Sequence, residues 1–171
     1  MLWRALGTID SGFYIDVGAA WPREHSVTKA FYDAGWSGIN VEPNPDFHAL
    51  LNQDRPRDCN LPLALAEHEG SADFVIFDAT GLSTLDPEVA SVHQEAGRAH
   101  RTRVVTVSTL SSVWAKHVPQ GQPVHFLKID VEGAEAAVLA GNDWSRNRPW
   151  IVVVEATVPM SQTESFADWE P

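Results

Sequence analysis

The residues of this chain best suited to chemistry are a lysine and an acid at the end of an apolar segment. The run Val124–Ile129 has the length and composition of a buried parallel strand, and Asp130 follows it directly. Side chains alternate along a strand, so Lys128 and Asp130 point to the same side. Open α/β sheets bind their ligands beyond the carboxyl ends of the strands, where Asp130 stands. The pair is therefore either a structural ion pair or part of a ligand site.

A second acidic strand lies near the start of the chain. The apolar segment Phe13–Val17 carries Asp16 and runs directly into Gly18. Glycine lets the backbone turn sharply or approach a ligand closely. A second acidic strand end favours a ligand site over a purely structural ion pair between Lys128 and Asp130.

A helix and another strand follow this glycine. The segment Ser26–Ala34 predicts a helix capped by Ser26, and the strand after it begins at Gly38 and ends in Glu42. Strand, glycine turn, helix, strand and acid is the βαβ order of a nucleotide-binding half. A lone Glu42 could be a surface acid, but this order favours a carboxylate that accepts two hydrogen bonds from a ribose diol.

The glycine turn also indicates which cofactors do not fit. After Gly18 no glycine occurs before Gly35, so the three spaced glycines that hold a pyrophosphate are absent. The loop instead contains Trp21 and Pro22, and no Walker-type sequence is present. Such a loop suits a nucleoside without phosphate, such as S-adenosylmethionine.

These motifs together resemble the FkbM-type family of S-adenosylmethionine-dependent methyltransferases. The resemblance extends from about Leu2 to the last residue, and it is carried by the segments Gly12–Ala19, Ser26–Asn44, Phe126–Glu135 and Trp150–Ala156. It implies a Rossmann-like class I methyltransferase, an α/β fold with a mostly parallel sheet and helices on both faces. Residues 1–171 would form a single methyltransferase domain.

The same resemblance assigns the cofactor-binding residues. The methionine part would lie against Asp16, Gly18 and Ala19, and Glu42 would hold the ribose between Pro43 and Asn44. Asp130 would face the transferred methyl group, and Ser26 completes this part of the expected site. Similar proteins continue past the point that matches Pro171, so we expect the final strands to be missing. An exposed sheet edge would then favour association into a homo-oligomer.

The middle of the chain predicts two strands around a turn, Asn60–Glu67 and Ala72–Phe77. The first should lie near the third parallel strand, where Leu63 and Ala64 would contact the adenine. The loop Gly81–Leu85 resembles a family loop over the acceptor, although Ser and Thr in a glycine turn are often only turn formers. A helix is expected over Thr109–His117 after a strand at Val104–Val107.

Charge and composition exclude several classes of function. The net charge of −11 disfavours a nucleic-acid substrate. The basic cluster of Arg98, Arg101 and Arg103 with His100 predicts either a solvated loop or a docking point for an acidic group of an acceptor. No apolar segment approaches the roughly 20 residues of a membrane span. With no evident signal peptide and with Cys59 as the only cysteine, we expect a cytoplasmic protein.

Methyl transfer to an alcohol needs positioning and a group that takes the hydroxyl proton. Asp130 is the first candidate, as a base or as a fixed carboxylate that binds the cofactor ammonium or orients the acceptor. Glu155, at the end of the segment Trp150–Val154, is the second, and Lys128 is included as the ionic partner. Asp130, Glu132 and Glu155 could also hold Mg²⁺, but no dedicated cage is evident and we expect no metal.

The sequence thus predicts a methyltransferase that methylates a hydroxyl of a sugar or glycan-like acceptor with S-adenosylmethionine. The acceptor class follows from the resemblance alone. One alternative is a nicotinamide or nucleotide-sugar enzyme, which the missing glycines disfavour. The other is a nucleotide- or cofactor-binding Rossmann-like module without methyl transfer.

Overall fold

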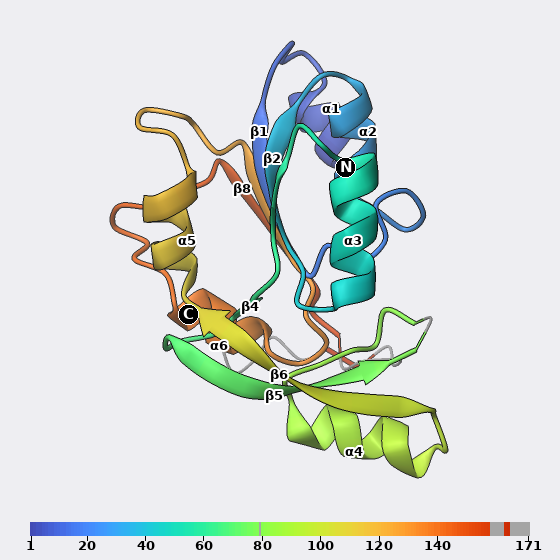
Figure 1. Ribbon diagram of the computed structural model, residues 1–171. Coiled ribbons are helices and arrows are strands. Elements are labelled where there is room, and N and C mark those ends of the chain that lie inside the picture. Colours follow the sequence, from blue (N-terminus) through green and yellow to red (C-terminus); the bar gives the residue numbers. More distant parts are fainter. Residues whose placement is uncertain (79, 158–162, 165–171) are drawn as a thin grey trace.

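The computed structural model describes residues 1–78, 80–157 and 163–164, whose strands form two sheets (Figure 1). The larger sheet is parallel, with the strand order β3-β2-β1-β7-β8. Its strands are β1 (Phe13–Val17), β2 (Ser37–Val41), β3 (Cys59–Leu61), β7 (Phe126–Ile129) and β8 (Ile151–Val154). The chain order reverses between β1 and β7, which is the position where open α/β sheets bind ligands. The α/β fold predicted from the sequence is confirmed.

Helices cover both faces of this sheet. Figure 1 shows α1 (Leu2–Leu6), α2 (Lys29–Asp33) and α3 (Pro45–Asp54) on one face, and α5 (Leu110–His117) and α6 (Glu135–Ala140) on the other. Side chains alternate along β1, which explains this arrangement. Tyr14 packs in one core cluster with Phe31 of α2, whereas Ile15 belongs to the core cluster that contains residues of α5 and α6. All residues of β7 are buried, as expected for a strand covered on two faces.

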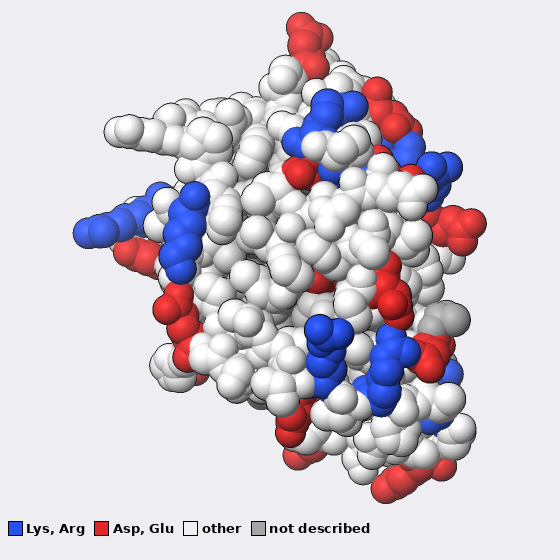
Figure 2. Space-filling view, in the orientation of Figure 1, with Lys and Arg blue, Asp and Glu red and all other residues white. Residues whose placement is uncertain are grey.

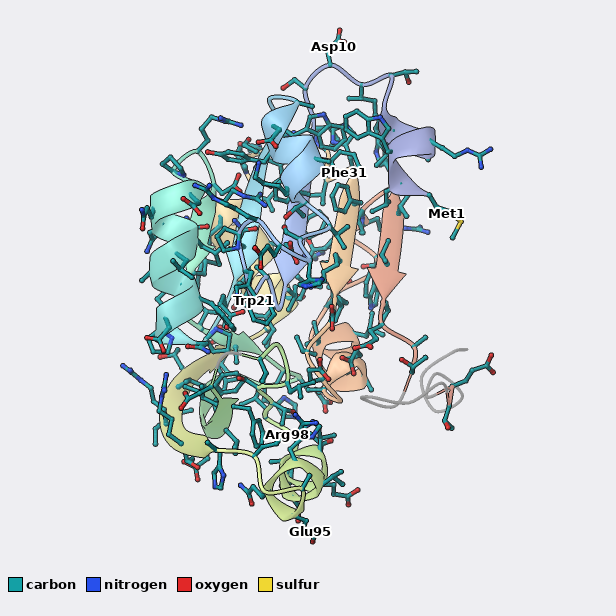
Figure 3. The ribbon with its side chains drawn as sticks, turned by 90° about the vertical axis from the view of Figure 1, so that its right-hand side faces the viewer. Met1, Asp10, Trp21, Phe31, Glu95 and Arg98 are labelled. Carbon is teal, nitrogen blue, oxygen red and sulfur yellow. The ribbon has the colours of Figure 1, made fainter. Side chains whose placement is uncertain are left out.

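The second sheet corrects one prediction. It has the order β4-β6-β5, with β4 (Ala64–Leu65), β5 (Gly70–Phe77) and β6 (His100–Ser108). The predicted pairing of the segments 60–67 and 72–77 is wrong, because β5 pairs antiparallel with β6, across α4 (Pro87–Glu95). Arg101 and Arg103 therefore lie in a strand and not in a loop before one. This sheet crosses near the carboxyl ends of the larger sheet (Figures 1 and 3).

Some element boundaries also differ from the expectation. The second helix begins at Lys29, and Thr28 occupies its cap position without a side-chain cap bond, so Ser26 is not the cap. The strand predicted from Val124 begins at Phe126. The predicted helix after Thr109 is confirmed, and the Thr109 hydroxyl accepts a hydrogen bond from the Ser112 N–H.

A buried arginine fixes the loop that follows β1. The Arg55 side chain is fully buried, and its guanidinium donates to the Pro22 carbonyl at 2.9 Å and to the Ser26 hydroxyl at 2.9 Å. Tyr14 donates to Asp58 at 2.6 Å, and Asp58 lies 3.8 Å from Arg55. A buried charge needs such partners. The loop between β1 and α2 is therefore anchored on the sheet and not left to solvent.

Strand β8 lies at the edge of the larger sheet within the described residues. Val152 and Trp150 on this side are exposed. Association through this edge stays a prediction. Among the described helices, none has the length and hydropathy to cross a bilayer.

Candidate functional site

A cavity opens beside the carboxyl ends of β1, β2 and β7, against the second sheet. It encloses about 530 Å³ of space between its lining atoms, open solvent at its mouth included. Trp21 lies between the two sheets in Figure 3, with its ring centre 4.7 Å from that of Phe47. The lining residues are Val17, Gly18, Ala20, Val41, Glu42, Pro43, Phe47, Ala64, Leu65, Phe74, Gly81, Ser83, Leu85, Asp130, Val131, Glu132 and Ala134.

Gly18 permits the close approach of two strand ends. Its φ is +74°, and a Cβ atom built at this position would lie 1.9 Å from the carbonyl oxygen of Asp130. The Gly18 N–H donates to the Val41 carbonyl at 3.0 Å. No side chain fits here, so the glycine expected to allow a close approach brings the turns after β1 and β7 together.

Glu42 is a buried carboxylate at the wall of the cavity. Its side-chain oxygens accept hydrogen bonds from the N–H groups of Ala20 and Asn44, each at 2.8 Å. Burial raises the pKa of Glu42 to about 7, although these two hydrogen bonds oppose the shift. A carboxylate has about four acceptor positions, so about two remain for a ligand hydroxyl pair.

Lys128 joins the carboxyl ends of β1 and β7. Its ammonium lies 3.2 Å from Asp16 and 3.3 Å from Asp130, and it donates to the Gly18 carbonyl at 2.7 Å. The expectation that Lys128 and Asp130 share one side is therefore correct. Burial disfavours the charged amine, but the two carboxylates outweigh burial, and the pKa of Lys128 lies above its usual value.

Three carboxylates gather at one end of the site. Asp130, Glu132 and Glu155 each place an oxygen within 4.8 Å of the other two. Burial raises the pKa of Glu132 to about 8 and that of Glu155 to about 7, and the neighbouring acids add to both shifts. Carboxylates at this spacing can share protons or bind a hard cation through oxygen.

Hydrogen bonds between side chains and the backbone hold the turn that carries Asp130 and Glu132. Glu132 has a φ of +58°, which is uncommon outside glycine, and Thr84 donates its hydroxyl hydrogen to the Glu132 carbonyl at 2.7 Å. The buried Glu135 carboxylate accepts from the N–H groups of Val131 at 2.9 Å and Gly133 at 3.1 Å. These contacts fix the turn between β7 and α6.

The predicted site residues fall into three groups. Those that line the cavity are Gly18, Glu42, Pro43, Ala64 and Asp130; those that support its wall are Asp16, Ala19, Asn44, Lys128 and Glu155. Ser26 and Leu63 do not line it, because Ser26 accepts from Arg55 and Leu63 packs against the core of the larger sheet.

Sequence reasoning missed several lining residues. Phe74 and Leu65 reach the cavity from the second sheet, whose pairing the sequence did not reveal. In the sequence, Glu132 stands out only as a possible magnesium ligand. The one available signal was its place between Asp130 and Gly133, in a turn after a strand.

Comparison with known proteins identifies one family. The model of the methyltransferase FkbM domain matches residues 16–171 of the chain. No curated protein and no solved structure matches the chain significantly. The matched segment includes the turns after β1 and β7 and all three acids of the cluster.

Replacement of Gly18 should destabilise the protein far more than an equivalent replacement elsewhere. We expect Gly18→Ala to lower the free energy of unfolding by about 3 kcal/mol or more, because its Cβ would overlap the Asp130 carbonyl. Gly97 has the same φ of +74° with nothing within 4 Å, so Gly97→Ala should cost only about 1–2 kcal/mol. Urea denaturation measures both values, and equal losses would refute the close-approach argument.

The raised pKa of Glu132 predicts a pH dependence of stability. The folded protein binds the proton more tightly than the unfolded chain, so the free energy of unfolding should fall as pH rises from about 4.5 to about 8. The free energy of unfolding of Glu132→Gln should fall less over this range, and at pH 9 it should exceed that of the natural protein. Glu95→Gln, at an exposed position remote from the cavity (Figure 3), should keep the natural slope. Urea denaturation at pH 5, 7 and 9 decides, and an unchanged slope in Glu132→Gln would contradict the prediction.

Proposed function

The chain belongs to the FkbM methyltransferase family, and from this premise we propose that it transfers the methyl group of S-adenosylmethionine to a hydroxyl of a sugar or glycan-like acceptor. The observation that carries the proposal is Glu42, a buried carboxylate with unused acceptor positions at a cavity beside the Gly18 turn. A ribose diol supplies the two hydroxyl donors that such a carboxylate can accept.

The cavity fits a nucleoside better than a dinucleotide. Its apolar wall from Phe47, Leu65 and Phe74 suits a base, and the turn at Gly18 lacks the further glycines that hold a pyrophosphate. S-adenosylmethionine would supply an electrophilic methyl group on a sulfonium. In this proposal Glu42 and Pro43 bind the ribose end, and Gly18 and Asp130 lie toward the methionine end.

The acid cluster would serve the acceptor. An alcohol must lose a proton as it attacks the methyl group, and a base with a pKa near the working pH is the most effective. Glu132 at about 8 meets this condition and lines the cavity beside Asp130. Asp130 then acts either as a second base or as a carboxylate, oriented by Lys128, that binds the cofactor ammonium or the acceptor hydroxyl.

The acidic cavity end also bears on the acceptor. Carboxylates accept hydrogen bonds from hydroxyl groups but repel a nearby phosphodiester, and the chain carries a net charge of −11. A polyhydroxylated acceptor is therefore favoured over a nucleic acid.

Replacement of Asp130 tests methyl transfer. With tritium-labelled S-adenosylmethionine and a panel of glycosides, we expect Asp130→Asn to reduce methyl transfer about 10²–10⁴-fold if it acts as a base. Cofactor affinity should stay within a few-fold of the natural protein, because the shape is retained. If Asp130 binds the cofactor ammonium instead, affinity and rate should fall together.

Asp10→Asn is the matched control, because Asp10 is far from the cavity (Figure 3) and should leave transfer unchanged. Full transfer with normal affinity and melting temperature in Asp130→Asn would remove Asp130 from the chemistry, and Glu132 and Glu155, the other two acids of the cluster, would be tested next. Binding of S-adenosylmethionine by the natural protein without transfer to any acceptor would favour the cofactor-binding module over an enzyme.

A further inference from the structure

A groove separate from the cavity lies between β6 and the start of α3. On one side it is lined by Pro43, Pro62 and two residues of α3, Pro45 and His48, and on the other by Arg103, Val104, Val105 and Thr106 of β6. Figure 2 shows basic side chains over β6 on this face of the molecule. Pro43 lines both the groove and the cavity, so the two spaces share one wall.

Arg103 points to the same side of the second sheet as the cavity. It is paired with Phe74 across the β5–β6 ladder, and paired side chains of an antiparallel sheet point to one face. Phe74 lines the cavity, and Val105, two residues after Arg103, is buried on that face. Arg103 is exposed and therefore extends beyond this buried wall toward the groove.

The neighbouring arginine shows what is unusual about Arg103. Arg101 contacts Asp46 at 2.5 Å and also pairs with Asp78. Arg103 has no hydrogen bond or ion pair with any residue that the structure describes. Arg101 thus binds two carboxylates, whereas the N–H donors of the Arg103 guanidinium are available to a ligand.

The remaining groups of the groove favour an anion. No carboxylate lines it; of the two acids adjacent to its lining residues in the sequence, Asp46 is held by Arg101, and Glu42 accepts hydrogen bonds from the N–H groups of Ala20 and Asn44. His48 lies 3.2 Å from the Asn60 carbonyl through Nε2, which fixes the ring against the wall. Three prolines offer a rigid apolar surface for a ring. In a chain with a net charge of −11, such a groove without carboxylates is a distinct local environment.

We propose that this groove binds the anionic group, a phosphate or a carboxylate, of a sugar derivative whose ring lies against the prolines. Guanidinium groups bind such anions in a bidentate manner. The groove shares Pro43 with the end of the cavity that the proposed function assigns to the ribose, so this ligand would lie on the ribose side of the site and not at the acid cluster.

Direct binding tests the groove without cofactor or turnover. The full chain is titrated with glucose 6-phosphate, glucuronate and glucose, and binding is measured by calorimetry and by the NMR signal of the Arg103 side-chain N–H. We expect both anionic sugars to bind more tightly than glucose, with a shift of the Arg103 signal and weaker binding at higher salt. Arg103→Gln should weaken anionic binding about tenfold or more.

Arg148→Gln is the matched control, because Arg148 is also exposed but does not line the groove. It should leave binding unchanged, and an equal loss in both variants would reduce the effect to overall charge and overturn the proposal. Unchanged affinity in Arg103→Gln, or glucose binding as tight as glucose 6-phosphate, would also overturn it. Anion binding lost in Arg103→Gln, in a protein without methyl transfer, would keep the groove and refute only the proposed function.

Discussion

The site depends on one buried ammonium. Lys128 lies among the carboxylates of Asp16 and Asp130 and the carbonyl of Gly18, so a single charge links β7, β1 and the turn after β1. Asp16 also accepts from the Thr28 hydroxyl at 2.8 Å, which extends the contact to the start of α2. An uncompensated charge at this depth would be costly, so the four groups are constrained to one arrangement. That arrangement fixes the position of the Asp130 carboxylate at the wall of the cavity.

The second sheet covers the carboxyl ends of the strands of the larger sheet. Parallel strand ends alone would leave Asp130 and Glu42 open to water, where a carboxylate is an ordinary surface group. Phe74 of β5 and Leu65 of β4 cover the opening with apolar side chains, and Trp21 lies at the same level. Burial then raises the pKa values of Glu42 and Glu132 toward neutrality. The raised pKa values of these two carboxyl groups are thus a consequence of the packing of the two sheets.

Four strands of the larger sheet, β1, β2, β7 and β8, could be predicted from the sequence because each contains apolar residues and is followed directly by an acid or a glycine, whereas β3 has no such signal. Asp130 and Glu42 were found by this rule. The pairing of β5 with β6 could not be predicted, because a helix separates them and the nearer segment offers a competing hairpin. Glu132 could not be placed either, because its left-handed backbone conformation is held in part by a hydrogen bond from Thr84, which is distant in the sequence.

The central claim is that the cavity holds a nucleoside cofactor without phosphate through Glu42, and calorimetry tests it most directly. The natural protein should bind S-adenosylmethionine and its demethylated product but not NAD. Glu42→Ala should weaken this binding by about 1–3 kcal/mol, the usual cost of an unsatisfied charged hydrogen-bond site. Micromolar NAD binding that S-adenosylmethionine cannot displace, or an unchanged dissociation constant in a folded Glu42→Ala variant, would contradict the account.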